Sequence, residues 1–119
     1  MSDDKQQIGA PAIQGAIGDS IPYEVIQNGL FLTATYADLH VNEQVAFEIH
    51  TDTQPLPLRE IVIVRQTEVD KGEVTHGFND SDVSNLVGKK IGVFVKLITR
   101  RPPLESAEGA YVVEEAPGT

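Results

Sequence analysis

The stretch Gln44-Val45-Ala46-Phe47-Glu48-Ile49-His50 alternates between two sets of side chains with a period of two residues. Val45, Phe47 and Ile49 form an apolar set, and the intervening residues form a more polar one. Successive side chains of a β-strand point to opposite faces, so this pattern predicts a strand with one dry face and one face toward water.

A second long strand is expected over Lys89–Thr99, where apolar residues again recur at every other position. The expected inward side chains are Ile91, Val93, Val95 and Leu97, and the outward ones are Lys90, Gly92, Phe94, Lys96 and Ile98. We expect the dry faces of the two strands to meet across a seam between two layers.

Shorter strands are expected at residues 21–26, 30–36, 59–67, 73–78 and 110–114. Residues 59–67 are apolar on both sides, as a covered central strand would be, and residues 51–58 read as a connection between sheets. Residues 79–86 predict one helical turn, which Gly88 would end. The whole pattern predicts an all-β fold, a two-sheet antiparallel sandwich of about seven strands with one short helical turn.

The chain has 119 residues, which suits one domain, and we place that domain at residues 8–116 after a disordered tail at 1–7. It has no cysteine and therefore neither a disulfide nor a thiolate metal site. Acidic residues at the N-terminus stand where a signal peptide needs basic ones, which predicts a cytoplasmic protein or export by a leaderless route. No apolar stretch is long enough for a membrane span.

The formal net charge is −9, which argues against a general nucleic-acid or anionic-membrane binder. Five bases between residues 89 and 101 form a run that contains no acid. A solvated strand face explains this run more simply than an anion site does.

The order of these features resembles the bacterial immunoglobulin-like repeats of large surface adhesins. The matching pieces are Leu32–Tyr36, the turn ending at Glu43, Val45–Ile49, Val83-Ser84-Asn85-Leu86-Val87-Gly88, Ile91–Leu97, and Glu105-Ser106 before Ala110–Val113. The resemblance covers residues 8–115 and implies an immunoglobulin-like sandwich with an interaction or structural role. Two departures stand out: Ile49 occupies a position where such repeats often have Trp, and His76 stands where an apolar inward residue is expected.

Several polar clusters could in principle bind a metal. Glu48, His50 and Asp52 alternate along one strand and its exit, but they fall on the face assigned to water. Turn chemistry explains Asp38 and Asn42 beside His40 and Glu43, and helix capping explains Asp80 and Asp82. His76 is expected to be a hydrogen-bonded core histidine if its face is buried. We therefore expect no metal and no cofactor.

The sequence contains no nucleophile elbow, Walker loop, dinucleotide fingerprint or His-Glu-x-x-His motif, and we predict a protein that is not an enzyme. The leading hypothesis is a non-enzymatic interaction module that acts through loops or an exposed sheet face. The expected interaction surface comprises Phe31, Phe94, Lys96, Ile98 and Arg100. We expect a protein partner or self-association rather than a small molecule, with edge pairing between copies as a route to a homo-oligomer.

The alternative hypothesis is a carbohydrate- or small-ligand-binding sandwich, for example a leaderless secreted effector or toxin component. Sugar sites usually stack a ring on an aromatic side chain, and Tyr23, Tyr36 and Tyr111 are the candidate platforms. The lack of tryptophan weighs against this alternative.

Overall fold

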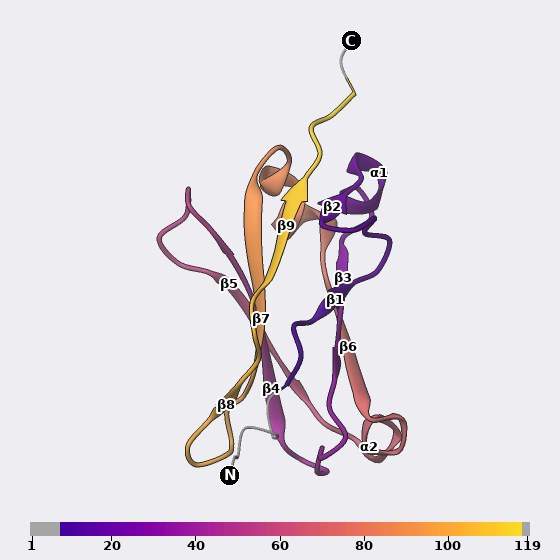
Figure 1. Cartoon of the computed structure of the whole chain (residues 1–119), viewed down its shortest axis with the longest axis vertical. Coiled ribbons are helices and arrows are strands. Elements are labelled where there is room, and N and C mark those ends of the chain that lie inside the picture. Colours follow the sequence, from indigo (N-terminus) through magenta and orange to yellow (C-terminus); the bar gives the residue numbers. More distant parts are fainter. Residues whose placement is uncertain (1–7, 118–119) are drawn as a thin grey trace.

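The computed structural model describes residues 8–117, and its described part consists mainly of strands arranged in two sheets (Figure 1). The strands are β1 (Ala12–Ile13), β2 (Ser20–Ile21), β3 (Leu30–Thr35), β4 (Gln44–Thr51), β5 (Leu58–Ile63), β6 (Glu73–Phe78), β7 (Lys90–Leu97), β8 (Leu104–Glu105) and β9 (Gly109–Val113). The helices are α1 (Tyr23–Ile26), α2 (Gln66–Lys71), α3 (Asp80–Val83) and the 3-10 helix η2 (Ser84–Leu86). The tail expected at residues 1–7 lies outside the described residues.

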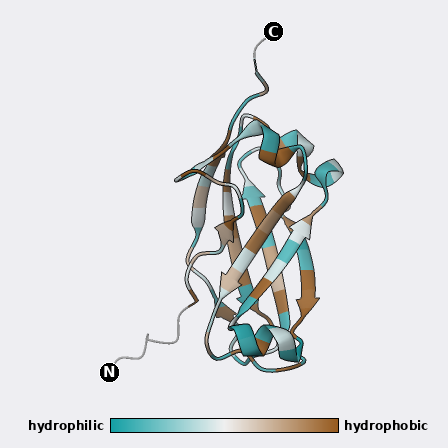
Figure 2. Ribbon diagram, turned by 90° about the vertical axis from the view of Figure 1, so that its right-hand side faces the viewer, coloured by the Kyte–Doolittle hydropathy of each residue, from teal (hydrophilic) through white to brown (hydrophobic). Residues whose placement is uncertain are grey.

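The smaller sheet has the strand order β1-β3-β6, and the larger sheet has the order β2-β9-β7-β4-β5, with β8 paired to β7. Every pairing between these strands is antiparallel except the one between β2 and β9, which is parallel. The prediction of a mostly β fold with two sheets is therefore confirmed, although the described residues contain nine strands instead of about seven and one parallel pairing. Apolar and polar residues interleave along the strands of both sheets (Figure 2), as expected when each sheet has one face on the core.

The core contains all seven inward residues predicted on β4 and β7, each of which is at most 4% exposed. However, β4 and β7 are neighbours in the same sheet, with Phe47 opposite Val95, so the expected seam between them was wrong. Buried side chains of β3 and β6, among them Leu32 and Phe78, belong to the same core cluster and cover this face from the smaller sheet. The period-two pattern identifies the dry face of a strand but carries no information about which strand lies beside it.

The prediction for residues 51–67 was wrong in two respects. Residues 51–58 do not connect the two sheets, because β4 and β5 are antiparallel neighbours within the larger sheet. β5 is also the last strand of that sheet rather than a covered central strand, and its Ile61 and Ile63 are 47% and 54% exposed. An apolar run on both faces is equally consistent with a buried strand and with an edge strand that exposes apolar side chains.

Two further helices were not predicted. α1 occupies Tyr23–Ile26, where a short strand was expected, because only Ser20 and Ile21 pair with β9 before Pro22 starts a helical turn. α2 follows β5 directly, and the Glu68 carboxylate accepts a hydrogen bond of 2.7 Å from the Arg65 N–H at its start. Gly72 ends α2 with a φ of 72°, a left-handed conformation that glycine adopts without steric cost.

Other predicted elements match the structure closely. β6 has the predicted bounds, and the predicted helical turn is present as α3 and η2, with Val83 and Leu86 fully buried. Gly29 precedes β3 with a φ of 90°, and a Cβ there would lie 2.4 Å from the carbonyl oxygen of Phe78. Among residues 8–117, no helix is both long enough and apolar enough to cross a membrane.

Candidate interaction surface

The outward-facing side of the larger sheet is the surface on which most of the predicted site residues gather, and we call it the outer face. The strand register aligns two rows of three residues across it: Ala46 lies opposite Ile61 and Lys96, and Glu48 lies opposite Arg59 and Phe94. Residues that are opposite in an antiparallel pair share one face, so β5, β4 and β7 together build this surface. It divides into a polar part around Glu48 and an apolar part along β5.

Glu48 lies in the centre of the polar part and is only 4% exposed. Its carboxylate lies 2.8 Å from His50 Nε2, 3.0 Å from Arg59 Nε and 3.4 Å from Lys96 Nζ. The prediction that this face of β4 is wet was therefore wrong at Glu48 and at Ala46, which is fully buried. β4 has a neighbouring strand on each side, and long side chains on such neighbours cover the centre of a sheet face with their alkyl stems.

The surroundings of Glu48 favour its charged form. Burial by itself raises the pKa of the Glu48 carboxyl group, but the hydrogen bond with His50, the charge of Lys96 and the bonds to Arg59 and Lys96 together outweigh burial. The pKa of Glu48 consequently lies below its ordinary value. This carboxylate organises the three basic side chains around it and does not offer a free acid to a substrate.

The metal hypothesis for Glu48, His50 and Asp52 gains no support from this arrangement, because the Glu48 oxygens already have three basic partners. Asp80 and Asp82 lie in the first turn of α3, where negatively charged carboxylates stabilise the helix N-terminus. Within residues 8–117, no group of three or more His, Asp or Glu side chains could hold a metal ion.

The apolar part of the outer face runs along β5. Ile61 and Ile63 project from it with about half of their surfaces exposed, and Leu56 in the preceding turn is 77% exposed. Ala46 is buried beside Ile61, and Ile98 lies half-buried just after β7, where its N–H donates to the Gln44 carbonyl at 3.1 Å. Exposed apolar side chains on the last strand of a sheet mark a surface suited to partner binding.

The predicted interaction residues do not all lie on one surface. Phe94, Lys96 and Ile98 lie along the outer face or just beyond its end, and the Phe94 ring meets the edge of the His50 ring at a centroid distance of 4.9 Å. Phe31 belongs to β3 in the other sheet, opposite Gly77, and points away from the core. A Cβ on Gly77 would lie 2.6 Å from the Phe31 ring, so this ring lies across the glycine.

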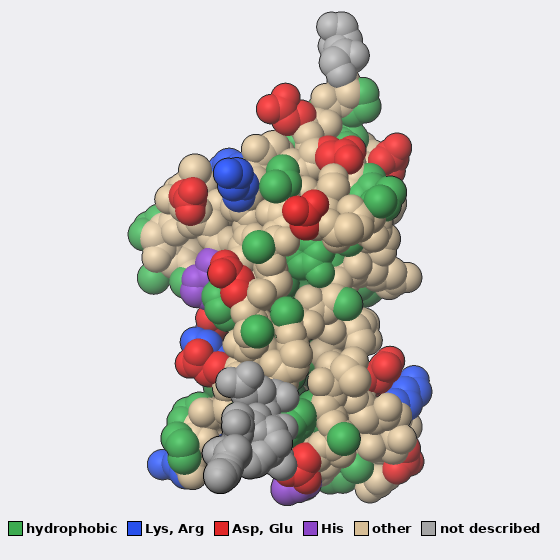
Figure 3. Space-filling model, viewed as in Figure 1, with side chains coloured by type: hydrophobic (Ala, Val, Ile, Leu, Met, Phe, Trp, Pro, Cys, Tyr) green, Lys and Arg blue, Asp and Glu red, His purple; other side chains and the backbone are tan. Residues whose placement is uncertain are grey.

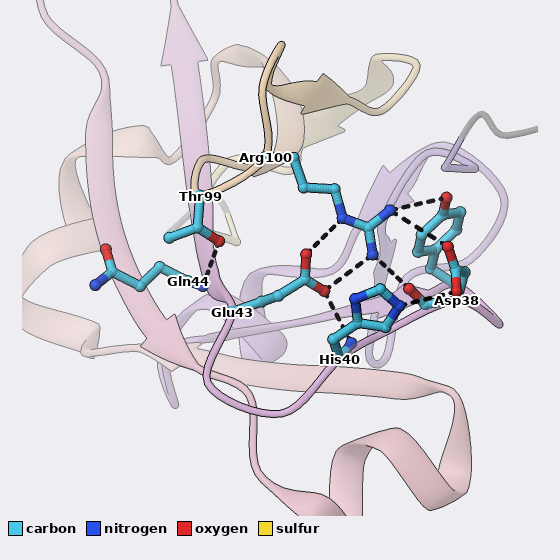
Figure 4. Close-up of polar contacts among 7 residues, drawn as sticks. Asp38, His40, Glu43, Gln44, Thr99 and Arg100 are labelled. Carbon is cyan, nitrogen blue, oxygen red and sulfur yellow. Dashed lines mark hydrogen bonds and ion pairs between the residues drawn. The ribbon is translucent and has the colours of Figure 1, made fainter.

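Arg100 belongs to a network that joins two loops at one end of the sandwich (Figure 4). Its guanidinium donates to both carboxylate oxygens of Glu43, with Nη2–Oε1 at 3.0 Å, and Nη2 also donates to the carbonyl oxygen of Asp38. The guanidinium carbon lies 5.5 Å from the centre of the Tyr36 ring. Arg100, which was predicted to belong to the interaction surface, is therefore held by contacts within the chain.

The charges of this network support one another. Burial by itself raises the pKa of the Glu43 carboxyl group. The hydrogen bonds and charge of Arg100 and the hydrogen bond from the backbone N–H of His40 outweigh burial, so the pKa of Glu43 lies below its ordinary value. The hydrogen bonds that Arg100 donates to Glu43 raise the pKa of Arg100, which stays charged. His40 also lies 3.1 Å from Asp38, so the predicted cluster of Asp38, His40 and Glu43 exists and is part of this network.

We predict that acid destabilises the chain partly through Glu43 and Glu48. Both pKa values are lower in the folded chain than the ordinary value of 4.5, so their contribution to stability is present above that value and is lost as pH falls through the folded pKa. Urea unfolding from neutral pH to about pH 3 measures the loss.

The double variant Glu43→Gln, Glu48→Gln should be less stable at neutral pH and should show a flatter acid limb. Glu108→Gln, at an exposed carboxylate, is the matched control and should leave the profile unchanged. An equally steep acid limb in the double variant would show that other carboxylates control the acid response.

His76 on β6 of the smaller sheet connects to β5 of the larger sheet. Its Nε2 bonds to the Glu60 carboxylate of β5, and its ring lies between Phe47 and Phe78 at centroid distances of 5.8 Å and 5.4 Å. The side chain is 25% exposed, so it is a hydrogen-bonded histidine at the rim of the core. Sequence reasoning missed its partner, because Glu60 lies on the other sheet.

Beyond Phe94 the outer face contains a depression of about 350 Å³ whose lining includes His50, Asp52, Gly92 and Glu108. On the side of the molecule that Figure 3 shows, Lys and Arg side chains are scattered among acidic ones and do not form one basic patch. Lys96 and Arg100, which belong to the predicted basic run, pair with acids of this chain.

Comparison of the sequence with protein-family models and with curated proteins gives no match. The residues of the outer face therefore provide the basis for a functional proposal.

Proposed function

We propose that this chain is an immunoglobulin-like, non-enzymatic interaction module that binds a partner protein through β5 and the adjoining outer face. The order in which the chain visits the two sheets supports the immunoglobulin-like part. β3 and β6 pair in the smaller sheet, while β4, β7 and β9 are neighbours in the larger one. Immunoglobulin domains likewise pair their second and fifth strands in one sheet and their third, sixth and seventh strands in the other.

The observation that carries the binding proposal is the free side of β5. β5 has six residues and ends the larger sheet, so one side of its backbone has no partner strand within the described chain. An extended peptide can add to such an edge, where backbone hydrogen bonds provide affinity and side-chain contacts provide specificity. Ile61 and Ile63 provide apolar contacts on the same strand.

The polar part of the outer face favours binding over catalysis. His50, Arg59 and Lys96 surround one carboxylate, and Glu48 hydrogen-bonds to them instead of activating a nucleophile. A rim of charged groups beside an apolar strip is the usual anatomy of a protein-binding surface.

Selection of a displayed random peptide library on the folded chain, followed by NMR mapping, tests the proposal. Selected peptides should perturb the amides of residues 58–63 and of the paired segment 44–48, and binding should be lost in Ile61→Lys. Ile17→Lys places the same charge at an exposed isoleucine far from β5 in the sequence and should bind normally. Selected peptides that leave residues 58–63 unperturbed would contradict the proposal.

One observation favours the small-ligand alternative. The smaller sheet carries an open groove of about 490 Å³ formed by Gln14, Gly15, Val25, Asn28, Gly29 and Phe31. Phe31 is 44% exposed, and the groove that it lines also contains the amide side chains of Gln14 and Asn28, which is the combination of aromatic and polar groups that a sugar site uses. Two of the three tyrosines expected as platforms are less suitable, because Tyr36 is buried and Tyr111 donates to the Pro11 carbonyl, whereas Tyr23 lines a separate depression beside Gln27 and Asp80. Peptides or glycans that perturb Phe31 and not β5 would favour this alternative.

A further inference from the structure

The free edges of the two sheets differ in how they are protected against pairing with another chain. β6 ends the smaller sheet, and Glu73, Thr75 and Gly77 alternate along its outward side. β1 and β2, at the other ends of the two sheets, have two residues each. Short length and polar side chains are the usual means of protecting a sheet edge. β5 is longer than β1 and β2 and contains the uncharged run Ile61-Val62-Ile63.

The two charged residues of β5 do not protect its edge, because both are paired within the chain. Arg59 Nε donates to Glu48 at 3.0 Å across the outer face, and Glu60 bonds to His76 on the opposite side of the strand. Charged side chains that are held by partners of the same chain repel an approaching strand less than free ones do. The part of β5 beyond Glu60 is therefore an apolar template for a further strand.

The hydrogen bonds around Val64 show which backbone groups of β5 are free. The N–H of Val64 donates to the Glu43 carbonyl at 2.8 Å, and its carbonyl accepts from the Asn42 N–H at 2.8 Å, so both groups point toward the β4 side. Backbone groups of successive strand residues alternate between the two sides. By this alternation, the N–H and C=O groups of Arg59, Ile61 and Ile63 point to the free edge.

We propose that the partner of β5 is a second copy of this chain, paired antiparallel about a two-fold axis through Ile61. This inference rests on the proposed function and specifies its partner. Ile61 faces Ile61 of the other copy, and Arg59 faces Ile63, so every free backbone group named above gains a hydrogen bond. The larger sheets of the two copies then form one continuous sheet.

The neighbouring registers are less favourable. Opposite residues must share a face, so the two-fold axis must pass through a residue and not between two residues. The alternatives nearest to Ile61 are therefore an axis through Glu60 and an axis through Val62. An axis through Glu60 places two carboxylates opposite each other. An axis through Val62 pairs only residues 61–63 within the strand, because β5 ends at Ile63. The register centred on Ile61 pairs residues 59–63 and opposes no like charges.

Light scattering during size-exclusion chromatography of the full chain, over a range of concentrations, tests the association. We expect a monomer–dimer equilibrium that weakens at low salt, because the net charge of −9 on each copy is then less screened. Ile61→Lys should weaken dimerisation at least about tenfold, and Ile17→Lys should leave it unchanged. Thermal melting identifies a variant that fails to fold. A wild-type chain that stays monomeric at all concentrations would overturn the proposal.

Cysteine cross-linking tests the register, and the natural chain has no cysteine to interfere. Ile61→Cys should form a disulfide-linked dimer on oxidation, because paired residues lie about 5.5 Å apart between Cα atoms. Ile63→Cys should not, because its two copies lie about 13 Å apart along the strands. A dimer in which Ile63→Cys cross-links and Ile61→Cys does not would refute this arrangement.

The two proposals can fail separately. Peptides that bind β5 on a chain that stays monomeric would leave the proposed function standing and would overturn self-pairing. A dimer that Ile61→Lys leaves intact would also overturn self-pairing through β5, whereas the peptide experiment would still decide the proposed function.

Discussion

Phe47→Ala should lower the free energy of unfolding by about 3–5 kcal/mol, the range seen when a buried phenylalanine is truncated to alanine. Phe47 is fully buried in the middle of β4, opposite Val95 on β7 and Glu60 on β5. Its ring also contacts His76 from the other sheet. The truncation would leave a cavity between the two sheets, and rigid strands on both sides limit how far the core can collapse into it.

Urea denaturation followed by circular dichroism measures this loss, and Phe31→Ala is the matched control. Phe31 is also a phenylalanine on a strand, but it is 44% exposed, so its truncation should cost about 1 kcal/mol or less. Similar losses for the two variants would show that Phe47 does not occupy the centre of the core.

Arg100→Ala should cost about 2–3 kcal/mol, the second largest effect that we expect. The variant leaves the nearly buried Glu43 carboxylate without its guanidinium partner, and removal of one partner from a fully buried pair typically costs more. Because the Arg100 side chain is 22% exposed, water compensates part of the loss. The carbonyl of Asp38 also loses a donor, which loosens the connection between β3 and β4.

Arg101→Ala provides the control, because it removes the same charge at the next residue, where the side chain is exposed. We expect less than about 0.5 kcal/mol from it. A double-mutant cycle with Glu43→Ala should show a coupling of about 1 kcal/mol or more between Arg100 and Glu43. Additive effects in that cycle would contradict the network. Arg100→Lys should restore only part of the stability, because an ammonium group cannot donate to both carboxylate oxygens in a fork.

Phe47 and Arg100 show which features of the core and of the charge network could be predicted from the sequence and which could not. Phe47 could be assigned to the core because strand side chains alternate strictly, and the same argument correctly placed Val93 and Val95. The same alternation holds on β3, where Leu30 and Leu32 are fully buried. The sequence did not reveal the partner of Arg100, because Glu43 lies 57 residues away in the chain and nothing local indicates that the two meet.

The candidate surface could be predicted only in part. Phe94 and Lys96 were correctly placed on the outward side of β7, and Ile98 lies just beyond its end. However, Phe31 lies on the other sheet, and Ile61 and Ile63 were assigned to a covered strand. The sequence pattern for β5 is the same whether a strand or water covers its second side. The exposed apolar edge became visible only when the strand order placed β5 last in the larger sheet.

The sequence by itself determined the strands β3, β4, β6, β7 and β9 to within a few residues, the core faces of β4 and β7, and the helical turn before β7. Alternation and turn residues act over a few neighbouring positions, so these features can be predicted locally. Only the tertiary structure decided which strands are neighbours, which edge is free, and which charges are paired. Those properties depend on contacts between residues distant in the chain. Glu48 shows the difference most clearly. Its position on β4 predicts a solvent-exposed carboxylate, but the side chains of Arg59 on β5 and Lys96 on β7 contact it, and it is buried.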